Sequence, residues 1–402
     1  MSELFITCGQ GVEALLRDEL LELGYTDVKP GFRGVYSEGD LEAIYKINYC
    51  SRIASRVLLP IKRFKCFNAK SLYDEMSRVD WTKYLPKGKT FAIDANVTHR
   101  QLRNSLYAAQ VVKDAICDQF RKNTGDRPSV QLRDPDVQFN LFIHESSGII
   151  QFDTSGAPLT KRGYRIEAVE APIHETLAAA LLRLADYKAE DILCDPCCGS
   201  GTFLIEAALI ASQTAPGYLR QKWGFMGMPD FNQQTWLKIK AEVDSKRVAL
   251  QPNHLMGCDL NRNAVRVAKG NARAAGFKDI EIAVSDFRTY EPPVKPTLII
   301  TNPPHGKRLD DEESLRPIYR ALGDFMKRKG TNRGGIFTGS LELAKEVGLA
   351  SKQRHVINNS GIESRFLLFD LWDGKDDAQP KAILQDEADE SDRRDVEGRL
   401  DG

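Results

Sequence analysis

The sequence predicts an α/β domain with a parallel sheet, preceded by an α+β region of similar size. From Asp191 onward, short apolar runs alternate with amphipathic segments, which is the order of parallel strands joined by helices. Before that point the expected strands and helices alternate less regularly, and one hairpin is expected. The chain has 402 residues and is 42% hydrophobic, so we expect two or three domains with ample cores.

The N-terminal region contains small strands and helices in succession. Residues 4–8 form an apolar run, and residues 12–23 and 41–53 repeat apolar side chains at helical spacing. Up to Lys65, basic residues then alternate with apolar ones, as in a strand with a basic flank. A strand over 90–98, a helix over 105–121 and a hairpin over 137–153 follow, which predicts an α+β arrangement.

Charge is distributed unevenly along a chain whose formal net charge is zero. Residues 46–165 hold 21 Lys and Arg against 11 Asp and Glu, a net charge of +10. Residues 1–45 hold 3 against 9, net −6, and residues 374–402 hold 5 against 10, net −5. A basic segment suits a phosphate backbone, although an ordinary solvated surface remains the alternative. The acidic end has few aromatic residues and is expected to be disordered.

The first sixteen residues, MSELFITCGQGVEALL, lack the basic and apolar parts of a secretory signal, and no later run is long enough to span a membrane. The eight cysteines form no framework for a disulfide scaffold. We therefore expect a cytoplasmic monomer with reduced thiols and no membrane partner. Cys194, Cys197 and Cys198 suggest zinc, but no second Cys/His pair follows at ligand spacing, so no metal is expected.

A strand, a glycine-containing loop and a helix are predicted between residues 192 and 212. This arrangement places a nucleotide-like ligand at the N-terminus of the helix, which begins at Thr202. Leu204 stands where the dinucleotide fingerprint has its third glycine, which argues against a pyrophosphate ligand. S-adenosylmethionine has no pyrophosphate, so it fits this loop.

Two acids follow the next two predicted strands. Asp259 ends the run at 255–258, where a carboxylate can accept both ribose hydroxyls, and Asp286 follows residues 280–285, where it can accept the adenine amine. Each alone is more often a turn or cap residue, but together with the loop they mark the carboxyl edge of one sheet. The predicted cofactor-binding residues are Asp195, Pro196, Cys197, Gly199, Gly201, Thr202, Asp259, Asp286 and Asn302.

The fourth strand of this domain ends in Asn302, Pro303, Pro304 and His305, which are the predicted catalytic residues. The side-chain oxygen of Asn302 and the carbonyl oxygen of Pro303 can hold the two hydrogens of an exocyclic amine and aim its lone pair at an electrophilic methyl group. The prolines fix their φ angles and offer no competing N–H, and His305 can stack on the base. The alternative is a turn that only ends a strand.

The stretch 214–252 carries several aromatic residues among basic ones. It forms either a lid over the base or an amphipathic helix packed on the sheet. We favour packing for Trp236 and leave open the roles of Tyr218, Trp223, Phe225 and Phe231. A helix over 315–329 and strands over 335–337 and 366–371 complete the expected elements.

The basic α/β segment, with DPDVQFNLFIH at 134–144, resembles the THUMP domain, an RNA-binding module of modification enzymes. Together with DPCCGSGT at 195–202 and TNPPHGKRL at 301–309, it makes the chain resemble the RlmL-type 23S rRNA guanine-N2 methyltransferases. That resemblance implies a Rossmann-like, class I S-adenosylmethionine-dependent methyltransferase domain acting on a guanine of large-subunit rRNA. The typical motif is NPPYGER, so His305 and Lys307 are departures that bear on base stacking.

The predicted domains are a ferredoxin-like part over 1–42, a THUMP domain over 43–154, a linker over 155–170, a methyltransferase domain over 171–373 and a disordered tail over 374–402. Lys161, Arg162 and Arg165 lie at the junction and are predicted to contact RNA, with a solvated linker as the alternative. A tRNA guanine-N2 methyltransferase and a non-catalytic RNA-binding assembly factor are the other functions considered. Intact site residues weigh against the assembly factor: Asp195, Gly199, Gly201, Asp259, Asp286 and Asn302.

Overall fold

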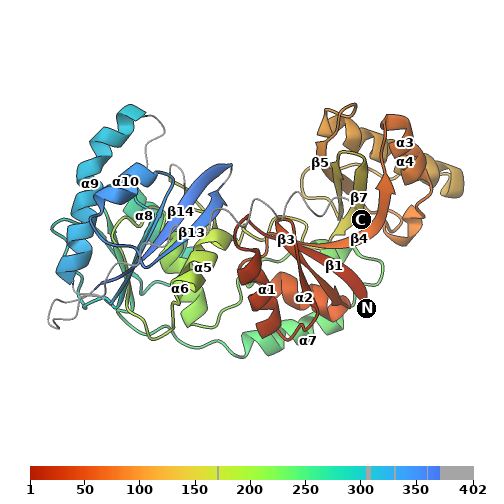
Figure 1. Ribbon diagram of the computed structural model, residues 1–402. Coiled ribbons are helices and arrows are strands. Elements are labelled where there is room, and N and C mark those ends of the chain that lie inside the picture. The colour runs from red at the N-terminus through yellow and green to blue at the C-terminus, as the bar shows by residue number, and fades with distance from the viewer. Residues whose placement is uncertain (170–171, 305–308, 330–331, 360, 372–402) are drawn as a thin grey trace.

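The computed structural model describes residues 1–169, 172–304, 309–329, 332–359 and 361–371. The predicted tail over 374–402 lies outside these residues. Figure 1 shows the parallel-sheet domain at one end of the molecule, the lobe with helices α3 and α4 at the other, and the N-terminal strands and helices between them. Within the described part of the chain, no helix is both long and apolar enough to cross a membrane.

One seven-stranded sheet, in the order β2-β3-β1-β4-β7-β6-β5, runs through the N-terminal half. Strand β4 joins the two parts of this sheet, because its first residues pair with β1 while its residues from Leu58 to Lys65 pair with β7. The predicted hairpin is confirmed as the β6–β7 pair. The strands are β1 (Ser2–Thr7), β2 (Val28–Gly31), β3 (Gly34–Gly39), β4 (Arg56–Lys65), β5 (Phe91–Thr98), β6 (Val137–His144) and β7 (Ser147–Asp153).

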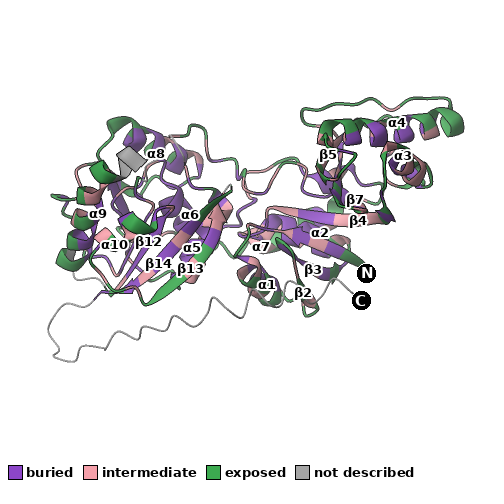
Figure 2. Cartoon of the chain, turned by 45° about the horizontal axis from the view of Figure 1, so that its top comes forward, coloured by how far each residue is buried: buried purple, intermediate pink, exposed green. Residues whose placement is uncertain are grey.

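Helices cover this sheet in two groups. Helices α1 (Glu13–Glu22) and α2 (Leu41–Cys50) belong to the β1–β4 part, so the boundary placed between residues 42 and 43 falls inside α2. Helices α3 (Ala69–Ser77) and α4 (Ser105–Thr124), with the short helix η1 (Trp81–Lys83), belong to the other part. Figure 2 shows buried and exposed residues alternating along α4, as expected of a helix that packs one face on a sheet.

The second seven-stranded sheet has the order β10-β9-β8-β11-β12-β14-β13. Strands β10, β9, β8, β11 and β12 pair in parallel, and β14 and β13 add antiparallel pairs at one edge. This sheet confirms the predicted α/β domain. Because the parallel strands point the same way, their carboxyl ends share one edge. The strands are β8 (Leu193–Asp195), β9 (Leu255–Asp259), β10 (Glu281–Val284), β11 (Leu298–Thr301), β12 (Arg333–Thr338), β13 (Gln353–Asn359) and β14 (Ile362–Asp370).

The helices of the C-terminal half connect these strands, and two of them, η2 and α7, belong to a segment that leaves the parallel-sheet domain. Helix α6 buries nearly every side chain, since it packs between the sheet, α5 and α8. The predicted helix that begins at Thr202 is confirmed as α6. The helices are α5 (Glu175–Leu184), α6 (Thr202–Ala211), η2 (Gly224–Gly227), α7 (Gln233–Asp244), α8 (Arg262–Ala274), α9 (Leu309–Lys329) and α10 (Leu341–Glu346).

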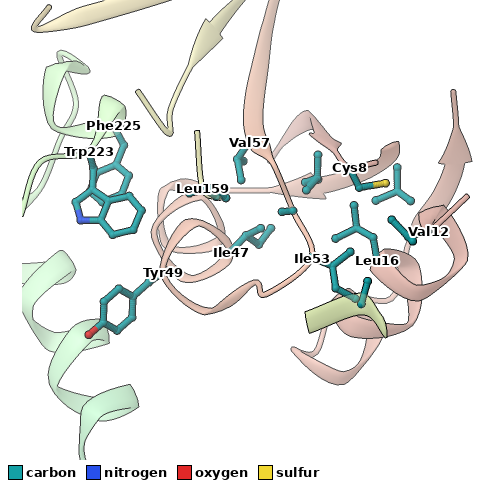
Figure 3. Close-up of a cluster of buried hydrophobic side chains, with 14 of the residues drawn as sticks. Cys8, Val12, Leu16, Ile47, Tyr49, Ile53, Val57, Leu159, Trp223 and Phe225 are labelled. Atoms are coloured by element: carbon teal, nitrogen blue, oxygen red, sulfur yellow. The ribbon is translucent and has the colours of Figure 1, made fainter. Parts of the chain in front are cut away.

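Residues 214–252 leave the parallel-sheet domain and pack on α2. The ring centroids of Tyr49 and Trp236 lie 5.3 Å apart, and the Tyr49 hydroxyl donates to Asp244 Oδ1 over 2.6 Å. Trp223 and Phe225 are buried in the same core, as Figure 3 shows beside Tyr49. Packing of Trp236 is therefore confirmed, but its partner is α2 and not the parallel sheet, and Phe225 belongs to this contact and to no lid.

A buried ionic cluster ties the segment 159–164 to both halves of the molecule. Glu206 of α6 is fully buried; its Oε1 accepts from the Tyr164 hydroxyl over 2.9 Å and lies 3.5 Å from Arg162 Nε. Arg162 donates to the carbonyl oxygens of Leu159 and Arg52, and Arg52 donates to the carbonyl oxygens of Leu209 and Thr214. The predicted linker is thus a packed part of the interface.

Candidate functional site

The loop after β8 is held by a buried carboxylate. Asp195 is 2% exposed, and its Oδ1 accepts from the Thr301 hydroxyl over 2.7 Å and from the Cys197 backbone N–H over 3.1 Å. Gly199 and Gly201 have φ angles of +52° and +80°, in the left-handed region that favours glycine. Asp195 therefore joins β8 to β11 and fixes the start of the glycine loop.

The loop also lies directly against β9. Its Gly199 N–H donates to Asp259 Oδ2 over 3.0 Å, and the Cys198 N–H donates to the Cys258 carbonyl oxygen over 3.0 Å. A Cβ on Gly257 would lie 2.7 Å from the Asp195 carbonyl oxygen, so only glycine allows this approach. The carboxylate of Asp259 is thereby placed beside the loop, as the sequence predicted.

The two acids that follow β9 and β10 differ in how much of their hydrogen-bonding capacity other groups of the protein already use. Asp259 accepts one backbone N–H on each oxygen, from Gly199 and from Asn261, and each oxygen keeps a free lone pair. Asp286 is paired with Arg288, whose Nε donates to both carboxylate oxygens over 2.9 and 2.8 Å. The hydrogen bond from Arg288 holds the pKa of Asp286 below its usual value. Asp259 is therefore the acid more open to a ligand.

Asn302 follows directly after β11, next to the strand that carries Asp195. Its side-chain Oδ1 is buried, and no group in the described part of the chain donates a hydrogen bond to it. A buried carbonyl oxygen without a donor costs free energy, and this oxygen has unused capacity to accept a hydrogen bond. Pro303 is buried and Pro304 is exposed, whereas the predicted His305 lies outside the described residues.

The predicted cofactor residues divide into two groups by burial. Five residues at the edge are half-buried: Cys197, Gly199, Asp259, Asp286 and Asn302. The other four are buried: Asp195, Pro196, Gly201 and Thr202. The structure thus brings all nine residues to one edge of the sheet, but the four buried ones are placed to stabilise the loop and not to contact a ligand directly.

The three basic residues predicted to contact RNA have different surroundings. Arg162 is 2% exposed within the ionic cluster, so the prediction of direct RNA contact is wrong for this residue. Arg165 donates to Glu175, Ser200, Thr202 and the Ile173 carbonyl oxygen, which directs its guanidinium into the protein. Lys161 is exposed and remains a candidate for RNA contact.

Sequence reasoning missed that residues 165–167 brace the glycine loop. The fully buried Asn271 of α8 donates to the carbonyl oxygens of Ser200 and Glu167 and accepts from the Ile166 N–H over 3.0 Å. One signal was available: Asn271 occupies a position on the apolar face of α8, where a polar side chain needs a specific partner.

The carboxyl of Asp195 gives the fold a pH dependence. Burial raises the pKa of Asp195 from 3.8 to about 7. The folded protein then holds this proton more tightly than the unfolded chain, so the group's contribution to stability is full below about pH 4 and is lost as pH rises to 7. We expect Asp195→Asn, which keeps an acceptor for Thr301 and Cys197, to remove this loss, on the order of 4 kcal/mol.

Urea unfolding of both proteins between pH 4 and 8 measures this effect. The variant should gain stability relative to the unsubstituted chain as pH rises to 7, and the difference should then level off. A stability difference that is constant over this range would show that Asp195 is ionised in the folded protein throughout.

Three family descriptions match consecutive parts of the chain. Residues 3–58 match the RlmL ferredoxin-like domain, residues 66–153 match the THUMP domain, and residues 162–362 match the RMKL-like methyltransferase domain. Strand β4 lies across the junction of the first two, which agrees with its pairing to both parts of the N-terminal sheet.

Individual relatives match over most of this chain. The Ribosomal RNA large subunit methyltransferase K/L of Methylococcus capsulatus is 38% identical over 92% of this chain, which spans 51% of that relative. A Synechocystis sp. protein provisionally named an RNA methyltransferase is 38% identical over 92% of this chain and 96% of its own length. The crystal structure of SMU.472, a provisionally named methyltransferase complexed with SAH, matches with a TM-score of 0.83 and 26% identity, over 92% of this chain and 98% of that one.

Proposed function

Because the chain belongs to the family of RMKL-like methyltransferases, in which it carries a ferredoxin-like and a THUMP domain, we propose that it methylates the exocyclic N2 of a guanine in 23S rRNA. The resemblances inferred from the sequence are confirmed at the level of the family, as is the Rossmann-like methyltransferase fold after a THUMP region. The methyl donor is S-adenosylmethionine, which is supported by the match to the RMKL-like methyltransferase domain and by the SAH complex of SMU.472.

The observation that carries the proposal is the buried, donor-free Oδ1 of Asn302. The lone pair of a guanine N2 is delocalised into the ring, so this nitrogen is a poor nucleophile. Oδ1 accepts one amine hydrogen, and the resulting hydrogen bond strengthens as the nitrogen becomes pyramidal and its lone pair turns out of the ring. After transfer the nitrogen is positively charged and loses one proton to water, so the reaction requires no strong base.

The loop and the acids offer groups that suit an adenosyl ligand. Gly199 has its φ in the left-handed region, and a Cβ added there would make an ordinary contact of 3.6 Å with the side chain of Val169. Asp259 has lone pairs available for ribose hydroxyls, and Cys197 lies half-buried beside it. When bound, S-adenosylmethionine supplies an electrophilic methyl group, which Asn302 would face across the carboxyl edge of the sheet. His305 is proposed to stack on the base after it has left the RNA helix.

Asp259→Ala tests the assignment of the ribose contact. We expect affinity for S-adenosylmethionine to fall about tenfold to a hundredfold, because a charge-assisted hydrogen bond is worth roughly 1.5–3 kcal/mol. RNA affinity should stay the same. Titration calorimetry measures the first and filter binding the second, with Asp324→Ala as the control for loss of one exposed carboxylate on the same domain. Equal cofactor affinity in both variants would show that another group binds the ribose.

The substrate class is tested by transfer of a tritiated methyl group to purified RNAs. We expect the protein to label undermethylated large-subunit rRNA and to leave tRNA unlabelled. Labelling of tRNA alone would favour the tRNA guanine-N2 methyltransferase. Cofactor binding without transfer to either RNA would favour the non-catalytic assembly factor.

A further inference from the structure

Helix α8 carries a basic face that the cofactor site does not use. Its outward positions hold four cations and its 13 residues include no acid. The spacing of four, three and four residues places these side chains within about 60° of one another around the helix axis, and all four are exposed. The residues of this basic face are Arg262, Arg266, Lys269 and Arg273.

Most of these cations are free to take a ligand. Arg266 pairs with Glu167, whereas Arg262, Lys269 and Arg273 have no hydrogen-bond or ion-pair partner in the part of the chain that the structure describes. By contrast, the exposed Arg316 and Arg320 of α9 both pair with one carboxylate, Glu346. Unpaired cations in a row create a local positive potential that favours an anionic partner.

A hollow of about 180 Å³ continues the basic face beyond the end of α8. Lys269, Arg273 and Lys278 line it together with Phe277 and Glu281, and Lys278 likewise has no polar partner within the described ranges. Three cations around one hollow, against the single carboxylate of Glu281, suit a phosphate group.

The basic face starts at the edge of the sheet where the cofactor residues lie. Asn261, which caps α8, follows Asp259 by two residues, and the helix then runs back along β9 and β10. From Arg262 to Arg273 the rise is about 16 Å, which is long enough for several backbone phosphates of one strand. In Figures 1 and 2, α8 lies far from α3 and α4 of the THUMP domain.

We propose that the basic face of α8, continued by Lys278, binds the phosphate backbone of the RNA along a path that leads away from the cofactor edge. This inference rests on the proposed RNA substrate and adds a contact separate from the THUMP domain. The RNA is then held on both sides of the site, by the N-terminal lobe and by the catalytic domain itself. No base is recognised by these contacts, because phosphate contacts position the RNA without reading its sequence.

The test compares two pairs of substitutions in the full chain. Lys269→Gln with Arg273→Gln removes two charges from the basic face, and Lys345→Gln with Lys352→Gln removes two exposed charges elsewhere on the domain, from α10 and from the residue before β13. Filter binding to transcribed large-subunit rRNA is measured over a series of salt concentrations. For the first pair we expect about tenfold lower affinity and a salt slope smaller by about 1.5, with cofactor affinity and thermal unfolding unchanged. The second pair should bind as the unsubstituted chain does.

Equal RNA affinity and salt slope for both pairs would overturn the inference while leaving the methyltransferase proposal intact. Arg262→Gln with Lys278→Gln provides a second pair for the same comparison. Loss of binding to phosphatidylserine vesicles with unchanged RNA affinity would assign the face to membranes and would also overturn it. If the unsubstituted chain binds no rRNA and labels none, the proposed function itself fails.

Discussion

Replacing Asn302 by alanine should slow methyl transfer by about a hundredfold to a thousandfold, by analogy with removal of a preorganised donor from an oxyanion hole. The reason is that Oδ1 is buried and has no donor in the described structure, so in the proposed reaction it can accept a hydrogen from the reacting amine. Single-turnover rates at saturating cofactor and RNA isolate this step from binding.

Asn302→Asp is the matched control, because it keeps an acceptor oxygen at the same place. It should retain more activity than Asn302→Ala, and both variants should bind RNA nearly as the unsubstituted chain does. A rate for the alanine variant within a few-fold of normal would mean that Asn302 only ends β11. If weaker RNA binding fully explained the lower rate of the alanine variant, Asn302 would bind the RNA and would not act in the chemical step.

Glu206→Ala should destabilise the folded protein by roughly 3–5 kcal/mol, because it leaves the buried Arg162 without its counter-ion. Burial already raises the pKa of Glu206, and the charge of Arg162 opposes that shift. The ordinary expectation for an exposed Glu on a helix would be a change within about half a kcal/mol. Urea unfolding at pH 7 measures the difference.

The double variant Glu206→Leu with Arg162→Met separates a lost charge pair from lost packing. Replacing both charges by apolar side chains of similar size should restore a large part of the stability, since no charge is left buried alone. A double variant as unstable as the sum of the two single variants would show that Arg162 acts through its bonds to Leu159 and Arg52 and not through Glu206.

That the proposed cofactor residues share one edge of the sheet could be predicted from the sequence, because each part of this edge is local. A strand, a glycine loop and a helix adjoin one another in the chain, and Asp259 and Asn302 come directly after strands that the apolar pattern marks. Parallel strands bring their ends to one edge whatever the rest of the fold does. Close approach at Gly257 and the pairing of Thr301 with Asp195 depend on neighbours across the sheet, so the sequence did not show them.

The junction could not be predicted in the same way. Lys161, Arg162 and Arg165 stand together in the sequence as a basic group, but the partners Glu175 and Glu206 that bury two of them lie 10 and 44 residues further along the chain. The periodicity of the sequence likewise shows that α7 has an apolar face. It does not show that this face packs on α2, which lies nearly 200 residues earlier in the chain. Long-range pairs of this kind require the three-dimensional structure.

The chemical claim is tested most directly by identifying the nucleoside that the protein makes. Undermethylated 23S rRNA is incubated with the protein and S-adenosylmethionine, digested to nucleosides and analysed by mass spectrometry against synthetic standards. The account predicts N2-methylguanosine at a single position, absent when Asn302→Ala is used for the same short reaction time. Methylated adenosine, a ring-methylated base or a methylated ribose as the product would contradict it.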